Sequence, residues 1–295
     1  MQYTAWEQSR HIEQSYLTAL KKLRKFITAL INDGDTLDII LNKLSALSND
    51  AAINKWAYTV AKTMVTNTLE ENARTWRQAA RTSGKGQWLY ESQQQSMSAR
   101  TSELIDRNAQ YIKSVPQDVA AQLVKFTGTQ AFSDNRSAYK APEFRALVGD
   151  MTENHARLIS RTETAKAHAA LNRAQAEDLG LGWYIWRSTR DVKTRDSHVF
   201  MNGILCRYND NPNPEALFNK YGGPSSASRD RKPMQSYGNY GPGETFQCRC
   251  YDAPVILWRT VTFPHKVHVG GEIIEMTKTA FYDRFGNDIG GKWAA

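Results

Sequence analysis

The chain has 295 residues, of which 41% are hydrophobic and 23% charged, a composition near the globular average that excludes global disorder and a fibrous repeat. Lys and Arg outnumber Asp and Glu by 38 to 30, which favours contact with a polyanion or an acidic protein surface, although dispersed basic residues more often form a solvated surface. No apolar stretch approaches the roughly 20 residues of a membrane span, and no secretory signal is visible. We expect a cytoplasmic chain of one large or two ordinary domains.

Periodic apolar residues predict that the chain is helical from its start to about Gly180. From Trp6 to Leu30 they recur at steps of mostly three or four, which places one apolar stripe on a helix that stops near Gly34. Pro116 is expected at the first position of a helix, where its missing N–H costs nothing. Further helices are expected over 37–47, capped by Asp35 and Thr36, and over about 51–80, 90–109 and 143–180. A turn is predicted at 83–86, and Gln93, Gln94 and Gln95 are expected on an exposed helix face.

After Gly180 the texture of the sequence changes to short β-prone runs between segments rich in Gly, Pro, Asn and Asp. The run Trp183–Trp186 predicts a strand, whose aromatic side chains could stack on bases but belong more often to a core. A second strand is expected at Pro254–Trp258, and a hairpin over Val267–Met276 that turns at Gly270-Gly271. The last residues, from Phe285, are expected to be mobile.

These elements together predict an α+β fold, with a mainly helical N-terminal region followed by a small loop-rich mixed α/β module. We expect a helical region over residues 1–114, the module over 115–254, and a C-terminal extension over 255–295 with short strands and a flexible end.

Three clusters of polar residues lie between Ser160 and Cys250, at 161–164, 187–198 and 242–250. Guanidinium and carboxylate groups at this density form bidentate pairs that hold an irregular loop onto a helix. The alternative is a solvent-facing patch of arginines that binds phosphates. We expect a structural network of Arg161, Glu163, Arg187, Asp191, Arg195 and Asp196.

One imidazole and three thiols in the same region form the ligand set of a Cys₃His structural zinc site. The candidate ligands are His198, Cys206, Cys248 and Cys250. One structural zinc would offset the small core of a loop-rich segment. Three reduced, buried cysteines fit the sequence equally well, and a redox or catalytic thiol is a lesser alternative.

Several blocks follow one another in this region: the run 159–164, the segments 186–191 and 194–198, Gly203 and the closing Cys248-Arg249-Cys250. In order and spacing, these blocks resemble the phage Mu F-like head-morphogenesis family. The resemblance covers roughly residues 115–252. Cys206 is not part of the family pattern, and the insert 208–240 is long.

The resemblance implies a minor head protein of a tailed bacteriophage, present in the virion head near the portal and in the host cytoplasm during assembly. Such a protein binds the portal protein and other capsid components and assists head assembly and DNA packaging or ejection. Contact with double-stranded DNA would be nonspecific and sensitive to salt, through dispersed basic residues such as Lys21, Lys22, Arg24 and Lys25. The resemblance implies no catalytic residue, and the DNA-binding residues stay unassigned.

Two enzyme classes are the alternatives. His198 with Asn202 and the cysteine pair resembles zinc-stapled nucleases, in which a histidine activates water, although a second histidine close by is missing. An ADP-ribosyltransferase would use an arginine for its dinucleotide and a paired Glu-x-Glu late in the chain. The segment Glu272–Glu275 does not supply that pair.

Overall fold

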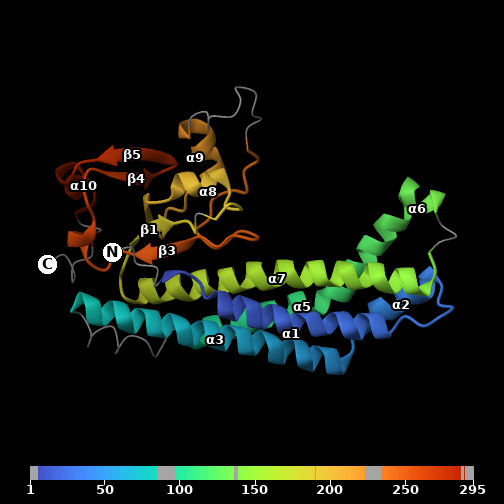
Figure 1. The fold of residues 1–295 in the computed structure, drawn as a ribbon. Coiled ribbons are helices and arrows are strands. Elements are labelled where there is room, and N and C mark those ends of the chain that lie inside the picture. Colours follow the sequence, from blue (N-terminus) through green and yellow to red (C-terminus); the bar gives the residue numbers. More distant parts are fainter. Residues whose placement is uncertain are drawn as a thin grey trace. The chain divides into compact units, whose positions relative to one another are not determined.

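The computed structural model describes residues 6–84, 97–135, 139–189, 191–222, 234–286 and 289. It confirms the α+β fold, because the N-terminal part is helical and a five-stranded sheet follows (Figure 1). The helices before the sheet are α1 (Arg10–Ala29), α2 (Leu37–Leu47), α3 (Ala51–Ser83), α5 (Met97–Thr127), α6 (Gln130–Asp134) and α7 (Ala141–Asp178). None of the helices in these described ranges combines the length and the apolar character of a membrane span.

The chain divides into two compact units in a way that the sequence did not predict. A helical unit comprises Ser9–Thr68 and Thr101–Thr164, and a mixed unit comprises Met1–Gln8, Leu69–Arg100 and Ala165–Ala295. The expected boundary between 114 and 115 falls inside the continuous helix α5, so the long helices α3, α5 and α7 each contribute residues to both units.

The helical unit is built on the predicted apolar stripe of α1. Tyr16, Leu20, Leu23 and Ile27 are buried on it, as a helical period of three to four residues requires. The side chain of Thr36 accepts a hydrogen bond from the backbone N–H of Ile39 and caps α2, as expected.

Pro116 lies inside α5 and does not begin a helix, so that prediction is wrong. Proline removes one backbone hydrogen bond from a helix interior and crowds the preceding turn. The neighbouring apolar residues Ile112, Val115, Val119 and Leu123 are at most 1% exposed. Burial of apolar side chains on both sides of Pro116 offsets that local cost and keeps the helix continuous.

The sheet of the mixed unit has the order β3-β1-β2-β4-β5. Its strands are β1 (Trp183–Arg187), β2 (Leu205–Arg207), β3 (Tyr251–Pro254), β4 (His265–Val269) and β5 (Glu272–Met276). Strand β2 pairs with β4 in parallel, with Leu205 opposite Val267, and the other pairs are antiparallel. The remaining elements of this unit are α8 (Asp196–Met201), α9 (Pro214–Tyr221), the 3₁₀ turn η4 (Trp258–Thr260) and α10 (Lys278–Phe285).

Strand β1 is buried on both faces of the sheet. Side chains alternate between faces along a strand, so Tyr184 and Trp186 enter one apolar core while Trp183 enters the other. All three are at most 2% exposed, which confirms the prediction that these aromatic residues belong to a core. The second core is completed by Phe281 of α10.

The C-terminal extension contributes to this sheet. Its hairpin β4–β5 is confirmed, with Gly270 and Gly271 both at positive φ, as a two-residue hairpin turn of type I′ requires. The strand expected at 254–258 instead begins at Tyr251, and Trp258 starts a 3₁₀ turn. Of the predicted turn at 83–86, residues 85 and 86 lie outside the described residues, as do Gln93, Gln94, Gln95 and nearly all of the chain after residue 286.

Candidate metal centre

Three of the four predicted metal ligands meet in the mixed unit. Nδ1 of His198, on α8, lies 3.4 Å from Sγ of Cys248 and 3.4 Å from Sγ of Cys250. The three donor atoms all lie within 4.8 Å of one another, and the side chains are at most 5% exposed. In the part of the chain that the structure describes, this is the group of His, Cys, Asp and Glu side chains that could hold a metal ion.

Cys206, the fourth predicted ligand, does not join this group. It lies on β2 directly opposite Tyr184 of β1, and its thiol points to the carbonyl oxygen of Ile204 at 3.7 Å. Burial raises the pKa of Cys206 far above its usual value. Of the four expected ligands, the structure therefore brings only His198, Cys248 and Cys250 together, and Cys206 is a buried thiol of the core.

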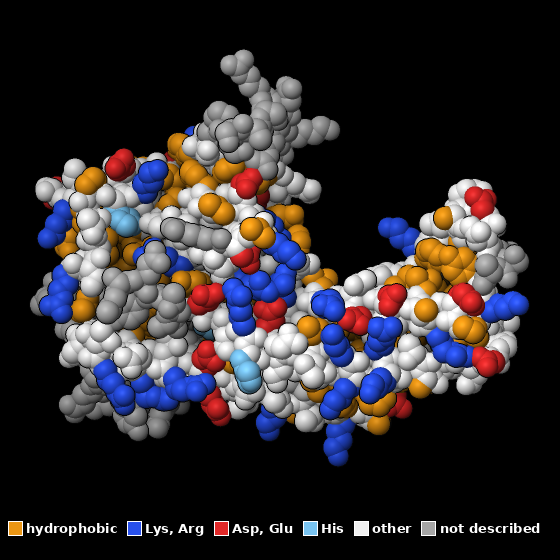
Figure 2. Space-filling view, in the orientation of Figure 1, with side chains coloured by type: hydrophobic (Ala, Val, Ile, Leu, Met, Phe, Trp, Pro, Cys, Tyr) orange, Lys and Arg blue, Asp and Glu red, His pale blue; other side chains and the backbone are white. Residues whose placement is uncertain are grey.

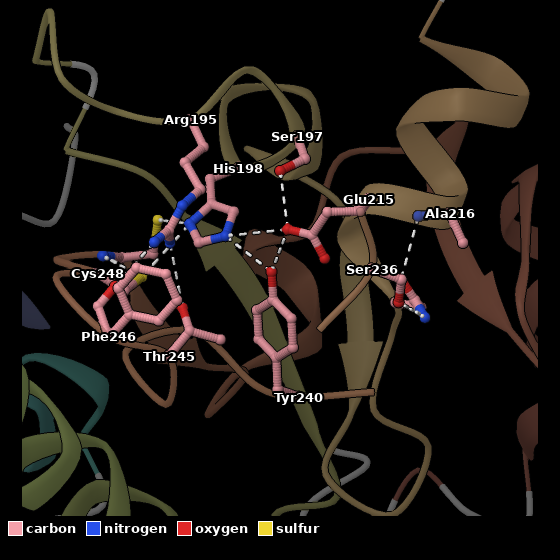
Figure 3. A network of polar contacts seen from close by, with 12 residues as sticks. Arg195, Ser197, His198, Glu215, Ala216, Ser236, Tyr240, Thr245, Phe246 and Cys248 are labelled. Carbon is pink, nitrogen blue, oxygen red and sulfur yellow. Dashed lines mark hydrogen bonds and ion pairs between the residues drawn. The ribbon is translucent and has the colours of Figure 1, made fainter. Parts of the chain in front are cut away.

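The other ring nitrogen of His198 faces two residues that the sequence did not single out. Nε2 lies 2.9 Å from the hydroxyl of Tyr240 and 3.8 Å from Oε1 of Glu215 (Figure 3). The Tyr240 hydroxyl donates to the same Glu215 oxygen at 2.6 Å, and the Ser197 hydroxyl donates to it at 3.2 Å. Because the Tyr240 hydroxyl donates its proton to the hydrogen bond with Glu215, the Tyr240 oxygen accepts a hydrogen bond from Nε2–H of His198. The ring lone pair of His198 is then on Nδ1.

Both partners of His198 come from the long insert 208–240. Asn213 caps α9, with its side chain accepting from the backbone N–H of Ala216, and Pro214 follows at the start of the helix. This places Glu215 in the first turn, where the helix dipole favours a carboxylate. The sequence Asn-Pro-Glu indicates a helix start, but no pattern in it indicates that the carboxylate reaches His198.

The two cysteines of the group have different acidities. The pKa of Cys248 lies well below its usual value, chiefly because the Cys250 thiol donates a hydrogen bond to it. The backbone N–H of Cys250 also donates to the Cys248 sulfur at 3.3 Å. The pKa of Cys250 is correspondingly raised by the neighbouring sulfur and by burial. Cys248 is therefore the thiol that most readily becomes a thiolate, the form that binds metals.

Gly243 and Arg195 position the segment that carries the cysteines. A side chain at Gly243, whose φ is +84°, would lie 3.2 Å from both the carbonyl oxygen of Cys250 and Cβ of Ala169 on α7. Arg195 donates to the carbonyl oxygen of Phe246 at 2.9 Å and lies over its ring. The segment is thus held against α7 on one side and against the start of α8 on the other.

The predicted arginine–carboxylate network divides between the two units. In the mixed unit Asp191 pairs with Arg249 at 3.2 Å, and Asp196 lies in the first turn of α8. In the helical unit, Arg161 pairs with Glu13 and Glu163 with Arg107. Arg187 lines a cavity of about 380 Å³ beside α3 and β3. The structure does not bring these six residues into one network, because Arg161 and Glu163 belong to a different unit from the loop.

A buried carboxylate joins β3 to α7 directly after the cysteines. Asp252 accepts hydrogen bonds from Nδ2 of Asn172 at 2.8 Å and from the hydroxyl of Tyr208 at 2.6 Å. Burial raises the pKa of Asp252 to about 6. The hydrogen bonds to Oδ2 of Asp252 therefore tie β3 to α7 and to Tyr208 directly after the two cysteines.

The basic residues of α1 are partly engaged within the helical unit. Lys21 and Arg24 both pair with Glu153 of α7, at 3.3 and 2.7 Å, while Lys22 and Lys25 are exposed. On the face drawn in Figure 2, Lys and Arg side chains are scattered among acidic and uncharged ones. This distribution resembles a solvated surface more than a groove built for a polyanion.

The geometry weighs against both enzyme classes. His198 is 2% exposed, and Asn202 accepts a hydrogen bond from the backbone N–H of Ser188 at 3.1 Å. Neither side chain is therefore placed to activate a water molecule for attack on a substrate. Glu272 on β5 bonds to Lys220 and to the hydroxyl of Tyr221, which occupies both of its oxygens.

Comparison with known proteins finds a family match from within α5 to the start of β3. Residues 117–252 match the family described as "Phage Mu protein F like protein". An uncharacterized protein of Haemophilus influenzae is 29% identical over 109 residues, which make up 37% of this chain and 19% of that protein. The chain therefore covers about a fifth of that relative's length. No solved structure matches the chain.

Proposed function

We propose that the chain, whose residues 117–252 match the phage Mu protein F-like family, is a phage head morphogenesis protein, namely a minor head protein of a tailed phage that binds the portal. It would act in the virion head near the portal, together with other capsid components, in head assembly and in DNA packaging or ejection. The family match over these residues is the observation that carries the proposal.

The matched segment and the rest of the chain suit different tasks in this function. His198, Cys248 and Cys250 all lie within 117–252, in a module whose strand β1 is buried on both faces. Such a module presents a rigid surface. The N-terminal helices lie outside the match and supply a docking surface for a particular portal.

We assign the docking surface to the exposed aromatic side chains that lie outside the matched residues, Phe26, Tyr58 and Tyr111 of the helical unit. Phe26 of α1 is 44% exposed and packs edge to face against Trp56 of α3, with ring centroids 5.7 Å apart. Comparably exposed aromatic residues of the mixed unit, such as Tyr237 and Phe246, lie inside the match. Aromatic residues dominate the energetics of protein interfaces.

A phage lacking the gene tests the function, and complementation tests the surface. We expect heads made without the protein to lose infectivity, and wild-type protein to restore it and to co-purify with the portal. Phe26→Asp should reduce co-purification at least tenfold, whereas Val192→Asp should not, because Val192 is fully exposed but lies in the mixed unit. Full infectivity of heads without the protein would refute the function; equal co-purification of both variants would refute the surface.

Double-stranded DNA is a further proposed partner, bound without sequence preference. A net charge of +8 and exposed residues such as Lys22 and Lys25 support weak phosphate contacts. Each phosphate neutralised steepens the fall of affinity with salt. A gel-shift titration should therefore show binding at low salt that disappears at physiological salt, and undiminished binding there would point to a dedicated DNA site instead.

We propose no catalytic activity for the chain. Incubation of the purified protein with plasmid DNA and Zn²⁺, Mg²⁺ or Mn²⁺ should leave the plasmid intact. Cleavage that is abolished in the His198→Ala variant would establish the nuclease alternative and overturn this part of the proposal.

A further inference from the structure

We propose that His198, Cys248 and Cys250 bind one zinc ion, through Nδ1 and two thiolates, and that Glu215 and Tyr240 orient the imidazole through Nε2. The site stands on these side chains alone, so it does not depend on the proposed role in the phage head. Neither the family match nor the relative assigns a metal to it.

The two nitrogen–sulfur distances fit a tetrahedral zinc site. With Zn–S near 2.3 Å and Zn–N near 2.0–2.1 Å, a tetrahedron separates nitrogen from sulfur by about 3.6 Å. Nδ1 of His198 lies 3.4 Å from each of the two sulfurs. A ring nitrogen offers one lone pair or one proton, so it can serve one thiol well, and its equal distance from two sulfurs suits a shared ion better.

The hydrogen bonds on the far side of His198 prepare it as a ligand. The chain from Nε2–H to the Tyr240 oxygen and from the Tyr240 hydroxyl to Glu215 fixes the proton on Nε2. Metal-binding histidines commonly donate their second N–H in this way, which sets the ring orientation and raises the basicity of the ligand. The three residues of this arrangement come from separate elements: His198 from α8, Glu215 from α9 and Tyr240 from a loop.

Glu215 completes this arrangement on the far side of the ring. It is 1% exposed, its Oε1 accepts from the hydroxyls of Tyr240 and Ser197, and its Oε2 has no hydrogen-bond partner among the described residues. This geometry fixes the position of the carboxyl group, and through Tyr240 that of the imidazole. The four-coordinate zinc sites of proteins with three protein ligands take a water molecule as the fourth ligand.

A zinc ion here would join α8 to the segment that leads into β3. The two segments are already linked by Arg195 to Phe246 and by Asp191 to Arg249, so the ion completes an existing contact and does not close a distant loop. Because all three ligands are at most 5% exposed, the ion would be closed off from substrate and its role structural, with its binding energy adding to the folding energy of a unit with short strands.

Elemental analysis of the full chain, purified without chelator, tests the site. We expect one zinc per chain in the wild type. Cys248→Ser and Cys250→Ser should each lose it, whereas Cys206→Ser, which alters an equally buried thiol outside the group, should keep it. Absence of zinc from the wild type, together with no uptake of added Zn²⁺ by the reduced protein, would overturn the proposal, as would loss of zinc in Cys206→Ser alone.

Cobalt substitution keeps the test decisive if the serine variants fail to fold. Co²⁺ added to the metal-free wild type and to Cys206→Ser should give the visible bands of a tetrahedral site and thiolate-to-metal charge transfer. Thiol counting on the denatured, metal-free wild type should find all three cysteines reduced. An octahedral cobalt spectrum, or two cysteines lost to a Cys248–Cys250 disulfide, would exclude the proposed centre.

Discussion

Glu215 holds one carboxylate oxygen 3.8 Å from Nε2 of His198, and both side chains are 2% exposed. The two residues come from consecutive helices, α8 and α9, and Tyr240 lies against both of them. The carboxylate cannot touch an ion on the Nδ1 side of the ring. It can act on the ion only by setting the orientation and basicity of the imidazole, which makes Glu215 a positioning residue.

Glu215→Gln should therefore weaken zinc binding while leaving the chain folded. Glutamine keeps an oxygen for Tyr240 and Ser197 but lacks the charge that raises the basicity of His198. Loss of such a partner typically weakens metal affinity about 10–100-fold, measurable by competition with a chromogenic chelator. Glu272→Gln removes an exposed carboxylate of the same unit and is the control. Equal zinc affinities for Glu215→Gln and wild type would show that the carboxylate does not act on the ligand.

Gly243 is expected to be the least replaceable glycine of the cysteine segment. Its φ of +84° and the close approach of Ala169 and Cys250 combine backbone strain with a clash. Gly238→Ala is the matched control, because Gly238 has a φ of +90° and nothing within 4 Å of the added carbon. We expect Gly238→Ala to cost about 1–2 kcal/mol of unfolding free energy, and Gly243→Ala about 1–3 kcal/mol more. Similar losses in thermal unfolding would mean that α7 can move away.

Phe281 should be essential to the sheet although it lies outside the family match. Its ring packs edge to face on Trp183 of β1, with centroids 5.1 Å apart, and is fully buried. Phe281→Ala should lower the unfolding free energy by about 3–5 kcal/mol, whereas Tyr282→Ala on the less buried side of α10 should cost less. If truncation after Pro254 left the melting temperature unchanged, the extension would be a separate element after all.

Much of the fold could be predicted because it depends on local patterns. The stripe of α1 follows from helical periodicity, and β1 from its aromatic run. The hairpin β4–β5 follows from Gly270-Gly271, since glycine tolerates the positive φ of that turn. The meeting of His198 with Cys248 and Cys250 was predicted from ligand chemistry alone, without knowledge of the fold.

The remaining features depend on contacts between residues far apart in the sequence, which local sequence patterns cannot predict. Cys206 lies in the same core cluster as Cys248 and Cys250 but outside their group with His198, because strand pairing places it opposite Tyr184, and strand register is set by the whole sheet. Pro116 stays inside α5 because tertiary burial outweighs its local preference. Glu215 and Tyr240 reach His198 from a segment whose composition indicates only loops and a helix start.

Glu153 provides a pH test in the helical unit. It accepts from Arg157 at 2.6 Å and from Arg24 at 2.7 Å, and it pairs with Lys21 at 3.3 Å. These hydrogen bonds lower the pKa of Glu153 from 4.5 to about 2. A carboxyl whose pKa is lower in the folded state stabilises the fold above its unfolded pKa. That contribution is lost as the pH falls from about 4.5 towards 2, because the unfolded chain then binds a proton more readily.

Glu153→Gln should therefore lower the unfolding free energy at neutral pH, and the difference from wild type should shrink to nothing as the pH approaches 2. Because the group is near the surface, the effect should be modest and should weaken further in high salt. Urea unfolding followed by circular dichroism at several pH values measures it, with Glu70→Gln, an exposed glutamate of α3, as the control. A difference that persisted unchanged at pH 2 would show that packing, and not the charge of Glu153, holds α1 against α7.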